Sequence, residues 1–358
     1  MEFLKKADFL KGAAATVDHG GSLGRAKTLF PHAPQPFVDL STGINPNSYP
    51  LFDLPASALL RLPEQARLRE LTAVAAVAYG APSPANVMAA PGTQILLPQV
   101  ASLVKPGKAV VLGPTYAEHA RAAAIAGHDV REAVDFDALA EADLAVVVNP
   151  NNPDGRVAKR ERLLALAAGL HARGGLLVVD EAFMDVGPRD QSLAGDVGQG
   201  GIVVLRSFGK FFGLAGARLG FALADEATAA RLEAQFGPWA VAGPALEYGI
   251  RALGDRDWQE RMRATLGSAS ARLDALFTRF AIPVAGGTSL FRYLDLPDAP
   301  GLFYALGFRG ILLRHYDERP NVLRAGLPGS EEEWLRLETA LAEWKMERSG
   351  PRAQGTQP

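Results

Sequence analysis

Apolar residues in the middle of the chain fall into short unbroken runs, separated by longer segments in which they recur at helical spacing. The four clearest runs are rich in Val, Leu and Ile and cover residues 109–112, 144–148, 176–179 and 202–205. Such runs are typical of strands buried on both faces of a parallel sheet. The helical patterns at 116–126 and 157–173 are each followed by a glycine, a residue suited to the end of a helix. This alternation predicts an α/β domain with right-handed crossovers.

The pattern changes toward the end of the chain. Residues 254–280 form one long amphipathic pattern, and short strands are predicted at 289–294, 310–313 and 322–325. A last helix is expected to begin at Ser330, with Glu333 three residues on as in a capping box. We therefore expect a large domain over residues 40–275, a smaller α+β domain from residues 1–39 and 276–347, and a flexible polar tail at 348–358.

Composition narrows the class of protein. Of the 358 residues, 48% are hydrophobic and 21% are charged, which is typical of a globular chain with a sizeable core. The formal net charge of -2 offers no general attraction for nucleic acid. The absence of cysteine excludes disulfides, thiolate metal sites and a cysteine nucleophile. Because neither a signal peptide nor a membrane-spanning run is visible, we expect a soluble cytoplasmic protein.

The segment after the run 202–205 carries the strongest candidate chemistry. Lys210 lies among glycines and aromatic residues in SFGKFFGLAGARLG, which begins at Ser207. A lysine at a strand end is well placed as a Schiff-base amine, because the pKa of a lysine falls readily on desolvation. Ser207 and Arg218 supply a hydroxyl and a guanidinium, which suit a phosphate group. The alternative interpretation is a glycine-rich turn with surface charges.

A second motif, Asp180-Glu181, ends the run 176–179. An acid at the end of a buried strand requires a partner. A pyridine nitrogen would supply one, since pyridoxal 5′-phosphate (PLP) acts as an electron sink while that nitrogen stays protonated. The alternatives are a helix N-cap and a metal ligand, and no His cluster accompanies the acid to favour a metal. Together Lys210 and Asp180 indicate a PLP site without a metal.

Three weaker motifs accompany these two: Asn152 in the turn 149–155, Gly92-Thr93-Gln94 before the helical run 95–104, and Tyr116 in the turn after 109–112. The amide is suited to the phenolate oxygen of the cofactor. The glycine and hydroxyl at a helix start suit an anion, because free N–H groups and the helix dipole point there. The tyrosine ring is suited to stacking. Each also has an ordinary interpretation, as a rigid turn, a common helix start or a packed tyrosine.

In this order and at these intervals, the motifs resemble the fold-type I PLP enzymes of the aspartate aminotransferase superfamily, over nearly the whole chain. The resemblance implies a mostly parallel central sheet with helices on both faces, a smaller α+β domain and a homodimer. It also implies the roles of the site residues: Gly92, Thr93, Gln94, Ser207 and Arg218 at the phosphate end, Tyr116 on the ring, Asn152 at the phenolate oxygen, Asp180 at the ring nitrogen and Lys210 as the covalent amine. Lys210, Asp180 and Tyr116 are expected to take part in catalysis.

Within the superfamily the chain is similar to the histidinol-phosphate aminotransferases and to the L-threonine-O-3-phosphate decarboxylases of cobalamin biosynthesis. The decarboxylases are favoured by the motif His19-Gly20-Gly21, by LSTGINP from Leu40, by APGTQ from Ala90 and by GPTYAEH from Gly113. Phe183 stands where the aminotransferases carry a Tyr that bonds the cofactor. Leu62 stands where relatives carry a Tyr that reaches the neighbouring subunit.

The resemblance thus implies decarboxylation of L-threonine O-3-phosphate to (R)-1-amino-2-propanol phosphate. This substrate carries two anionic groups, and Arg314 and Arg324 are the expected partners because a guanidinium suits both. An ion pair with a neighbouring acid is the alternative for Arg314. His19 and Asn45 are further candidates by resemblance. Two other functions stay open: an aminotransferase acting on histidinol phosphate or a similar amino compound, and a PLP-binding regulatory or assembly protein without turnover.

Overall fold

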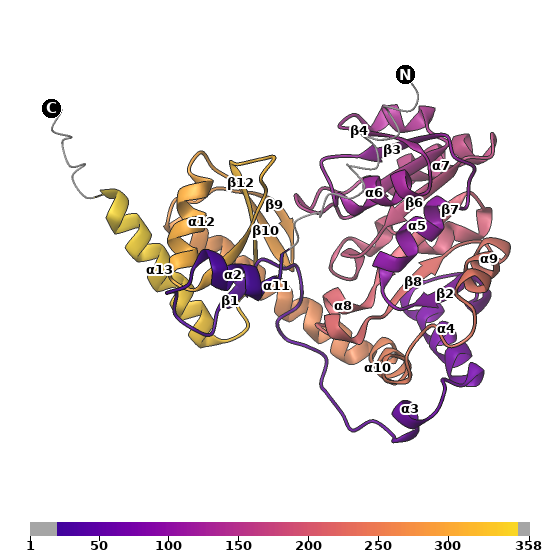
Figure 1. Cartoon of the computed structure of the whole chain (residues 1–358), viewed down its shortest axis with the longest axis horizontal. Helices are drawn as coiled ribbons and strands as arrows, with labels where there is room; N and C mark the ends of the chain where they lie inside the picture. Colours follow the sequence, from indigo (N-terminus) through magenta and orange to yellow (C-terminus); the bar gives the residue numbers. More distant parts are fainter. Residues whose placement is uncertain (1–19, 350–358) are drawn as a thin grey trace. The chain divides into compact units, whose positions relative to one another are not determined.

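The computed structural model describes residues 20–349, which form two compact units (Figure 1). The large unit is Asn47–Ala264, and the small unit combines residues 20–46 with residues 265–349. His19 lies outside the described residues. The domain boundaries expected near residues 40 and 275 remain a prediction.

A seven-stranded sheet forms the centre of the large unit, in the order β2-β8-β7-β6-β5-β3-β4. Its strands are β2 (Val87–Ala90), β3 (Lys108–Leu112), β4 (Asp129–Ala133), β5 (Leu144–Val148), β6 (Leu176–Asp180), β7 (Ile202–Ser207) and β8 (Gly220–Leu223). Strand β8 runs antiparallel to both of its neighbours, whereas β3 to β7 are mutually parallel. The mostly parallel α/β sheet expected from the sequence is therefore confirmed.

The four predicted buried strands are confirmed as β3, β5, β6 and β7. Strands β2, β4 and β8 were not predicted, for a reason visible in their residues. Strand β4 lies at the sheet edge and most of its residues are exposed or half-buried, so it has no apolar run. Strands β2 and β8 have only four residues each and contain Ala or Gly, which weakens the strand pattern.

The helices of the large unit are α3 (Ser57–Leu60), α4 (Gln65–Tyr79), α5 (Leu96–Ala101), α6 (Glu118–Ile125), α7 (Arg160–His171), α8 (Phe208–Phe211), α9 (Glu226–Phe236), α10 (Gly243–Gly254) and the start of α11 (Arg256–Arg279). The 3-10 turns are η1 (Pro84–Asn86), η2 (Thr93–Ile95), η3 (Phe136–Glu141), η4 (Met184–Val186), η5 (Arg189–Gln191), η6 (Ala194–Gln199) and η7 (Ala215–Ala217). The helices predicted at 116–126 and 157–173 are confirmed as α6 and α7, and those at 95–104 and 254–280 as α5 and α11. Helices α6 and α7 are each followed by a glycine at positive φ, 90° at Gly127 and 78° at Gly174, where a side chain would be strained.

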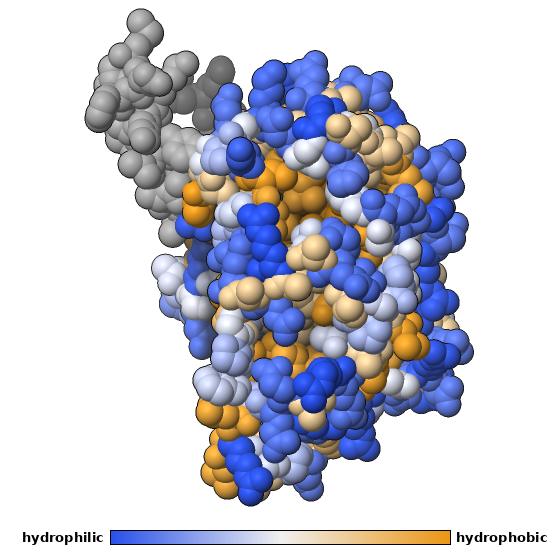
Figure 2. Space-filling model, turned by 90° about the vertical axis from the view of Figure 1, so that its right-hand side faces the viewer, coloured by the Kyte–Doolittle hydropathy of each residue, from blue (hydrophilic) through white to orange (hydrophobic). Residues whose placement is uncertain are grey.

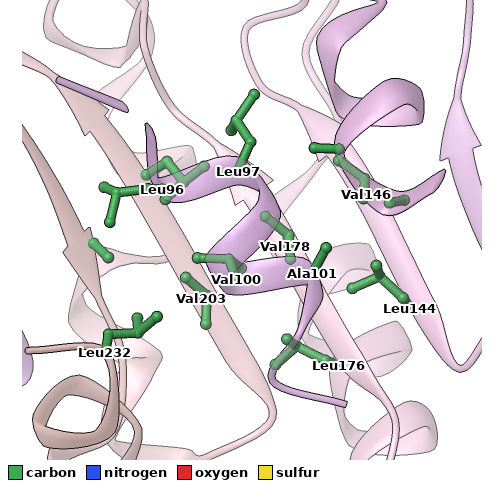
Figure 3. Close-up of a cluster of buried hydrophobic side chains, with 14 of the residues drawn as sticks. Leu96, Leu97, Val100, Ala101, Leu144, Val146, Leu176, Val178, Val203 and Leu232 are labelled. Carbon is green, nitrogen blue, oxygen red and sulfur yellow. The ribbon is translucent and has the colours of Figure 1, made fainter. Parts of the chain in front are cut away.

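One face of this sheet is covered by a single apolar cluster (Figure 3). Leu96 and Val100 of α5 contribute to it together with Val146 of β5, Val178 of β6 and Val203 of β7. Because side chains alternate between the faces of a strand, Val147 and Val179 point to the opposite face, and they are buried there as well. These strands are therefore buried on both faces.

The parallel strands follow the order β4-β3-β5-β6-β7. After β3 the chain forms β4 on one side of it, and then crosses back to form β5, β6 and β7 on the other side. The connections therefore diverge between β3 and β5. In doubly wound sheets, ligands bind beyond the carboxyl ends of the strands at this point. A ligand site is therefore expected at the loops that follow β3 and β5.

The small unit has a five-stranded sheet in the order β1-β11-β12-β10-β9. Its strands are β1 (Val38–Leu40), β9 (Val284–Thr288), β10 (Phe291–Asp295), β11 (Ile311–His315) and β12 (Val322–Gly326), and its helices are α2 (Leu23–Leu29), α12 (Ala299–Phe308), α13 (Glu331–Ser349) and the rest of α11. The helix predicted at Ser330 is confirmed, since the Ser330 hydroxyl accepts from the Glu333 N–H at 3.2 Å. Helix α2 was not predicted, because only Ala26 of its seven residues is buried and no helical period results.

Candidate active site

The loops after β3 and β5 are joined by hydrogen bonds at the carboxyl edge of the large sheet. The Thr115 hydroxyl donates to the Asn151 side-chain oxygen at 2.6 Å, and the Asn151 amide nitrogen donates to the Pro114 carbonyl at 3.1 Å. Asn151 is buried, whereas its neighbour Asn152 is half-buried. Asn151 therefore fixes the loop that presents Asn152 and the loop that presents Tyr116. No local sequence signal distinguishes this role of Asn151 from that of any residue in a rigid turn.

Asp180 is the last residue of β6 and is buried, with 6% of its surface exposed. One carboxylate oxygen accepts from the Ala182 N–H at 3.0 Å. The other lies 2.8 Å from Nε2 of His119, a buried residue in the first turn of α6. An imidazole thus orients the carboxylate that the sequence predicts for the ring nitrogen of a cofactor. His119 belonged to a motif of the resemblance, but its partner lies 61 positions away and could not be identified from the sequence.

The segment after β7 brings the predicted phosphate residues together. Gly92 has φ of 89°, and a Cβ at this position would lie 2.5 Å from Nη2 of Arg218. A Cβ at Gly220 would lie 2.6 Å from the backbone nitrogen of Thr93. The two glycines therefore permit the turn at Thr93 to pack directly on the segment that carries Arg218 and, eight residues earlier, Lys210. Ser207 ends β7, and Lys210 follows it in α8.

Tyr116 and Gln94 interact directly. The Tyr116 hydroxyl donates to Oε1 of Gln94 at 3.0 Å. The pKa of Tyr116 is raised to about 12, mainly by burial and further by the carboxylates of Glu118 and Asp180, while Arg218 opposes the shift. His119, which contacts Asp180, lies edge-on to the Tyr116 ring at a centroid distance of 6.0 Å. Tyr116 is a neutral phenol, suited to lie against an aromatic ligand.

A buried ion cluster braces the strands behind these residues. Arg206 of β7 donates to Oε2 of Glu181 at 2.9 Å and to Oδ1 of Asp185 at 2.7 Å. Burial raises the pKa of Glu181, and the charge of Arg206 and the donated hydrogen bonds oppose the shift. Glu181 and Arg206 directly adjoin Asp180 and Ser207 in the chain, so the cluster holds the ends of β6 and β7 in register. The sequence analysis did not identify it.

In the small unit, Arg314 and Arg324 lie directly opposite each other on the antiparallel strands β11 and β12. Arg324 is buried and donates from Nη2 to the carbonyl of Ser41 at 2.9 Å. Its pKa is lowered by burial first and by the charge of Arg314, against the contributions of Tyr316 and Asp39. Like charges directly opposite each other in a sheet destabilise it. Asn45, in the segment that follows Ser41, is buried as well.

The large unit thus gathers Gly92, Thr93, Gln94, Tyr116, Asn152, Asp180, Ser207, Lys210 and Arg218 on the turns and strand ends described above, and the small unit carries Asn45, Arg314 and Arg324. The residues of the large unit suit a phosphorylated aromatic cofactor. The backbone at Gly92-Thr93, the Ser207 hydroxyl and the Arg218 guanidinium suit its phosphate, and the buried Asp180 suits a protonated ring nitrogen. Lys210 offers the amine.

Comparison with known proteins gives the family. The sequence model described as "Aminotransferase class I and II" matches residues 64–348. The chain belongs to this family. It is 44% identical over 332 residues to the threonine-phosphate decarboxylase of Pseudomonas aeruginosa, which covers 92% of this chain and 98% of that protein. It is 41% identical over 336 residues to the threonine-phosphate decarboxylase of a Sinorhizobium species, covering 93% of this chain and 100% of that protein.

The fold is also found among solved structures. The histidinol-phosphate aminotransferase of Sinorhizobium meliloti, solved in complex with pyridoxal-5′-phosphate, has a TM-score of 0.77 and 20% sequence identity. The match covers 95% of this chain and 97% of that one, and at this identity it establishes the fold. Within residues 20–349, no helix combines the length and the apolar character needed to cross a membrane.

Proposed function

We propose that this chain is a PLP-dependent decarboxylase that converts L-threonine O-3-phosphate to (R)-1-amino-2-propanol phosphate for cobalamin biosynthesis. The observation that carries the proposal is the 44% identity to a threonine-phosphate decarboxylase along 92% of this chain. The residues gathered at the carboxyl edge of the large sheet support the cofactor. A cytoplasmic location is part of the proposal and agrees with the lack of cysteine.

In this proposal the large unit holds the cofactor at both ends. Nζ of Lys210 would bind its aldehyde. Thr93, Ser207 and Arg218 would hold the phosphate, and Asp180 would keep the ring nitrogen protonated. When bound, PLP supplies an electron sink for the electron pair left behind when a bond to the substrate α-carbon breaks. His119 fixes the rotamer of Asp180, so the carboxylate needs no rearrangement to serve this purpose. Tyr116 packs on the ring, and Asn152 donates to the phenolate oxygen.

Two anionic groups of the substrate require cations, and we assign them to Arg314 and Arg324. The two guanidiniums repel each other across β11 and β12, and burial already disfavours the charge of Arg324. A bound carboxylate or phosphate would offset both costs with charge-assisted hydrogen bonds. Asn45 and His19 are proposed as further substrate contacts. Nζ of Lys210 would hold a proton near the substrate α-carbon and could donate it there as a general acid.

A homodimer is the second part of the proposal. Large apolar side chains are exposed along one stretch of the large unit: Leu51 (74%), Leu59 (74%), Leu60 (82%) and Leu62 (64%). Trp239, 53% exposed, lines a cavity of about 370 Å³ between α4, β2 and α9. Figure 2 views the large unit from the side on which α9 lies in Figure 1 and shows apolar patches among polar side chains. Exposed large apolar side chains that lie close together in the chain are consistent with a protein–protein interface.

The test is incubation of the purified, PLP-loaded protein with L-threonine O-3-phosphate alone. Release of carbon dioxide without a second substrate supports the decarboxylase. A requirement for 2-oxoglutarate, or turnover of histidinol phosphate instead, would establish the aminotransferase. Binding of PLP without either reaction would establish the regulatory or assembly role, and a Lys210→Ala variant that retains full turnover would overturn the assignment of the amine.

A further inference from the structure

Three side chains of the large unit, those of Tyr116, Gln94 and Glu118, form a hydrogen-bonded series. The hydroxyl of Tyr116 donates to Oε1 of Gln94 at 3.0 Å, and Nε2 of Gln94 donates to Oε2 of Glu118 at 2.8 Å. Glu118 is the first residue of α6 and only 5% of its surface is exposed. Arg121, one turn further along the helix, donates to the same carboxylate oxygen at 3.2 Å. The buried end of the series is therefore an anchored carboxylate.

The chemistry of these groups determines which one donates and which one accepts in each hydrogen bond. An ionised carboxylate only accepts hydrogen bonds, so the amide nitrogen of Gln94 must face Glu118. The amide oxygen then faces Tyr116, and the phenol must donate its proton to it. A phenol is protonated at neutral pH, so Tyr116 has this proton to donate. A tyrosine held by its hydroxyl has a restricted ring tilt as well as a fixed proton.

We propose that Glu118 and Gln94 are positioning residues that fix the ring of Tyr116, and that Gln94 acts on the cofactor through this ring. The inference rests on the proposed function, in which Tyr116 packs on the cofactor. It matters for the reaction because the bond that breaks is selected by its angle to the cofactor ring. If the Tyr116 ring is held by its hydroxyl, the cofactor ring packed against it can tilt less. The rate of bond cleavage depends on placement of this precision.

A purely structural role is the competing explanation for Glu118. An acid in the first turn of a helix is favoured by the helix dipole whatever else it contacts. This role predicts a loss of thermal stability on substitution but no change in how the cofactor is held. The two explanations therefore differ in the signals of the bound cofactor, which are measured without turnover.

The decisive experiment is a double-mutant cycle with Gln94→Met and Tyr116→Phe. Met has a similar length and no hydrogen bond to offer, and Phe retains the ring without the hydroxyl. Each single variant should weaken PLP binding by about two- to tenfold, the range expected for one lost hydrogen bond. Each should also reduce the visible circular dichroism of the bound cofactor. The double variant should be no worse than either single variant, because both remove the same interaction.

Gln99→Met is the matched control, since it makes the same chemical change in α5, five residues along. It should leave PLP affinity and the dichroism unchanged. Glu118→Gln, which retains an acceptor but loses the charge, should have a smaller effect than Glu118→Ala. If the effects of Gln94→Met and Tyr116→Phe add in the double variant, or if Gln94→Met matches the control, the inference is wrong. A wild-type protein that binds no PLP would instead overturn the proposed function.

Discussion

The two units differ in how their buried charges are arranged. In the large unit, buried acids meet buried bases: Asp180 faces His119, and Glu181 and Asp185 both bind Arg206. In the small unit, Arg324 is buried directly across from Arg314, and its pKa is lowered first by burial and further by the charge of Arg314. The first arrangement is balanced within the protein and gives a rigid surface for a resident cofactor. The second places two guanidiniums opposite each other with Asp39 as an opposing charge, which suits an anionic ligand that is bound and released in each turnover.

Substitution of Asp180, the acid paired with His119, should have the largest effect on turnover. Asp180→Asn retains the shape of the side chain but loses the charge that is proposed to keep the cofactor nitrogen protonated. We expect carbon dioxide release to fall by about 10²- to 10⁴-fold, the range for a lost proton-controlling group. His119→Leu, which leaves the carboxylate in place, should cause a smaller loss in the same assay. Equal losses from the two variants would contradict the separate roles.

Loss of an arginine in the small unit should act on substrate binding instead. Arg324→Leu removes a charge-assisted contact, and such contacts contribute about 1.5–3 kcal/mol. We therefore expect KM for threonine phosphate to rise by about 10- to 100-fold, as measured by initial rates. PLP affinity should stay unchanged because the cofactor residues belong to the large unit. A loss of PLP affinity in this variant would contradict the proposal that the large unit binds the cofactor and the small unit binds the substrate anions.

The raised pKa of Tyr116 predicts a loss of stability in alkali. Between pH 10 and about 12, the folded protein retains a phenolic proton that the unfolded chain has lost, so the free energy of unfolding falls as the pH rises. The full effect is up to about 3 kcal/mol, at about 1.4 kcal/mol for each pH unit. Denaturant unfolding of the apoprotein at several pH values should show a shallower alkaline loss for Tyr116→Phe. Identical slopes in the two proteins would contradict the shift.

The smallest expected effect is a gain in stability. Arg314→Leu removes the charge opposite Arg324, and relief of a cross-strand repulsion is worth about 0.2–1 kcal/mol. The melting temperature of the apoprotein should therefore rise slightly, although catalysis is weakened. Inorganic phosphate should stabilise the wild-type protein more than this variant, since the anion offsets the same repulsion. Equal stabilisation of both proteins by phosphate would place the anion elsewhere.

Many of the site residues could be predicted from the sequence because they lie in short local motifs. Lys210 with Ser207 and Arg218 occupies one segment of twelve residues, and Asp180 ends a buried run whose position is evident from hydropathy alone. Strands buried on both faces have the strongest apolar signal, so β3, β5, β6 and β7 were predicted. The exposed edge strand β4 and the short helix α2 have no such signal and were missed.

The sequence by itself determined the parallel α/β architecture, the candidate amine and the candidate acid, because each depends on residues close together in the chain. Only the tertiary structure decided the partners that orient them. His119 meets Asp180 across 61 positions, Arg206 meets Glu181 across 25, and Gln94 meets Glu118 across 24. Such pairings depend on the order and register of strands, which side-chain spacing in the chain does not contain. The physical reason is that hydropathy records how deeply a residue is buried, whereas the identity of its neighbours follows from how the strands are arranged.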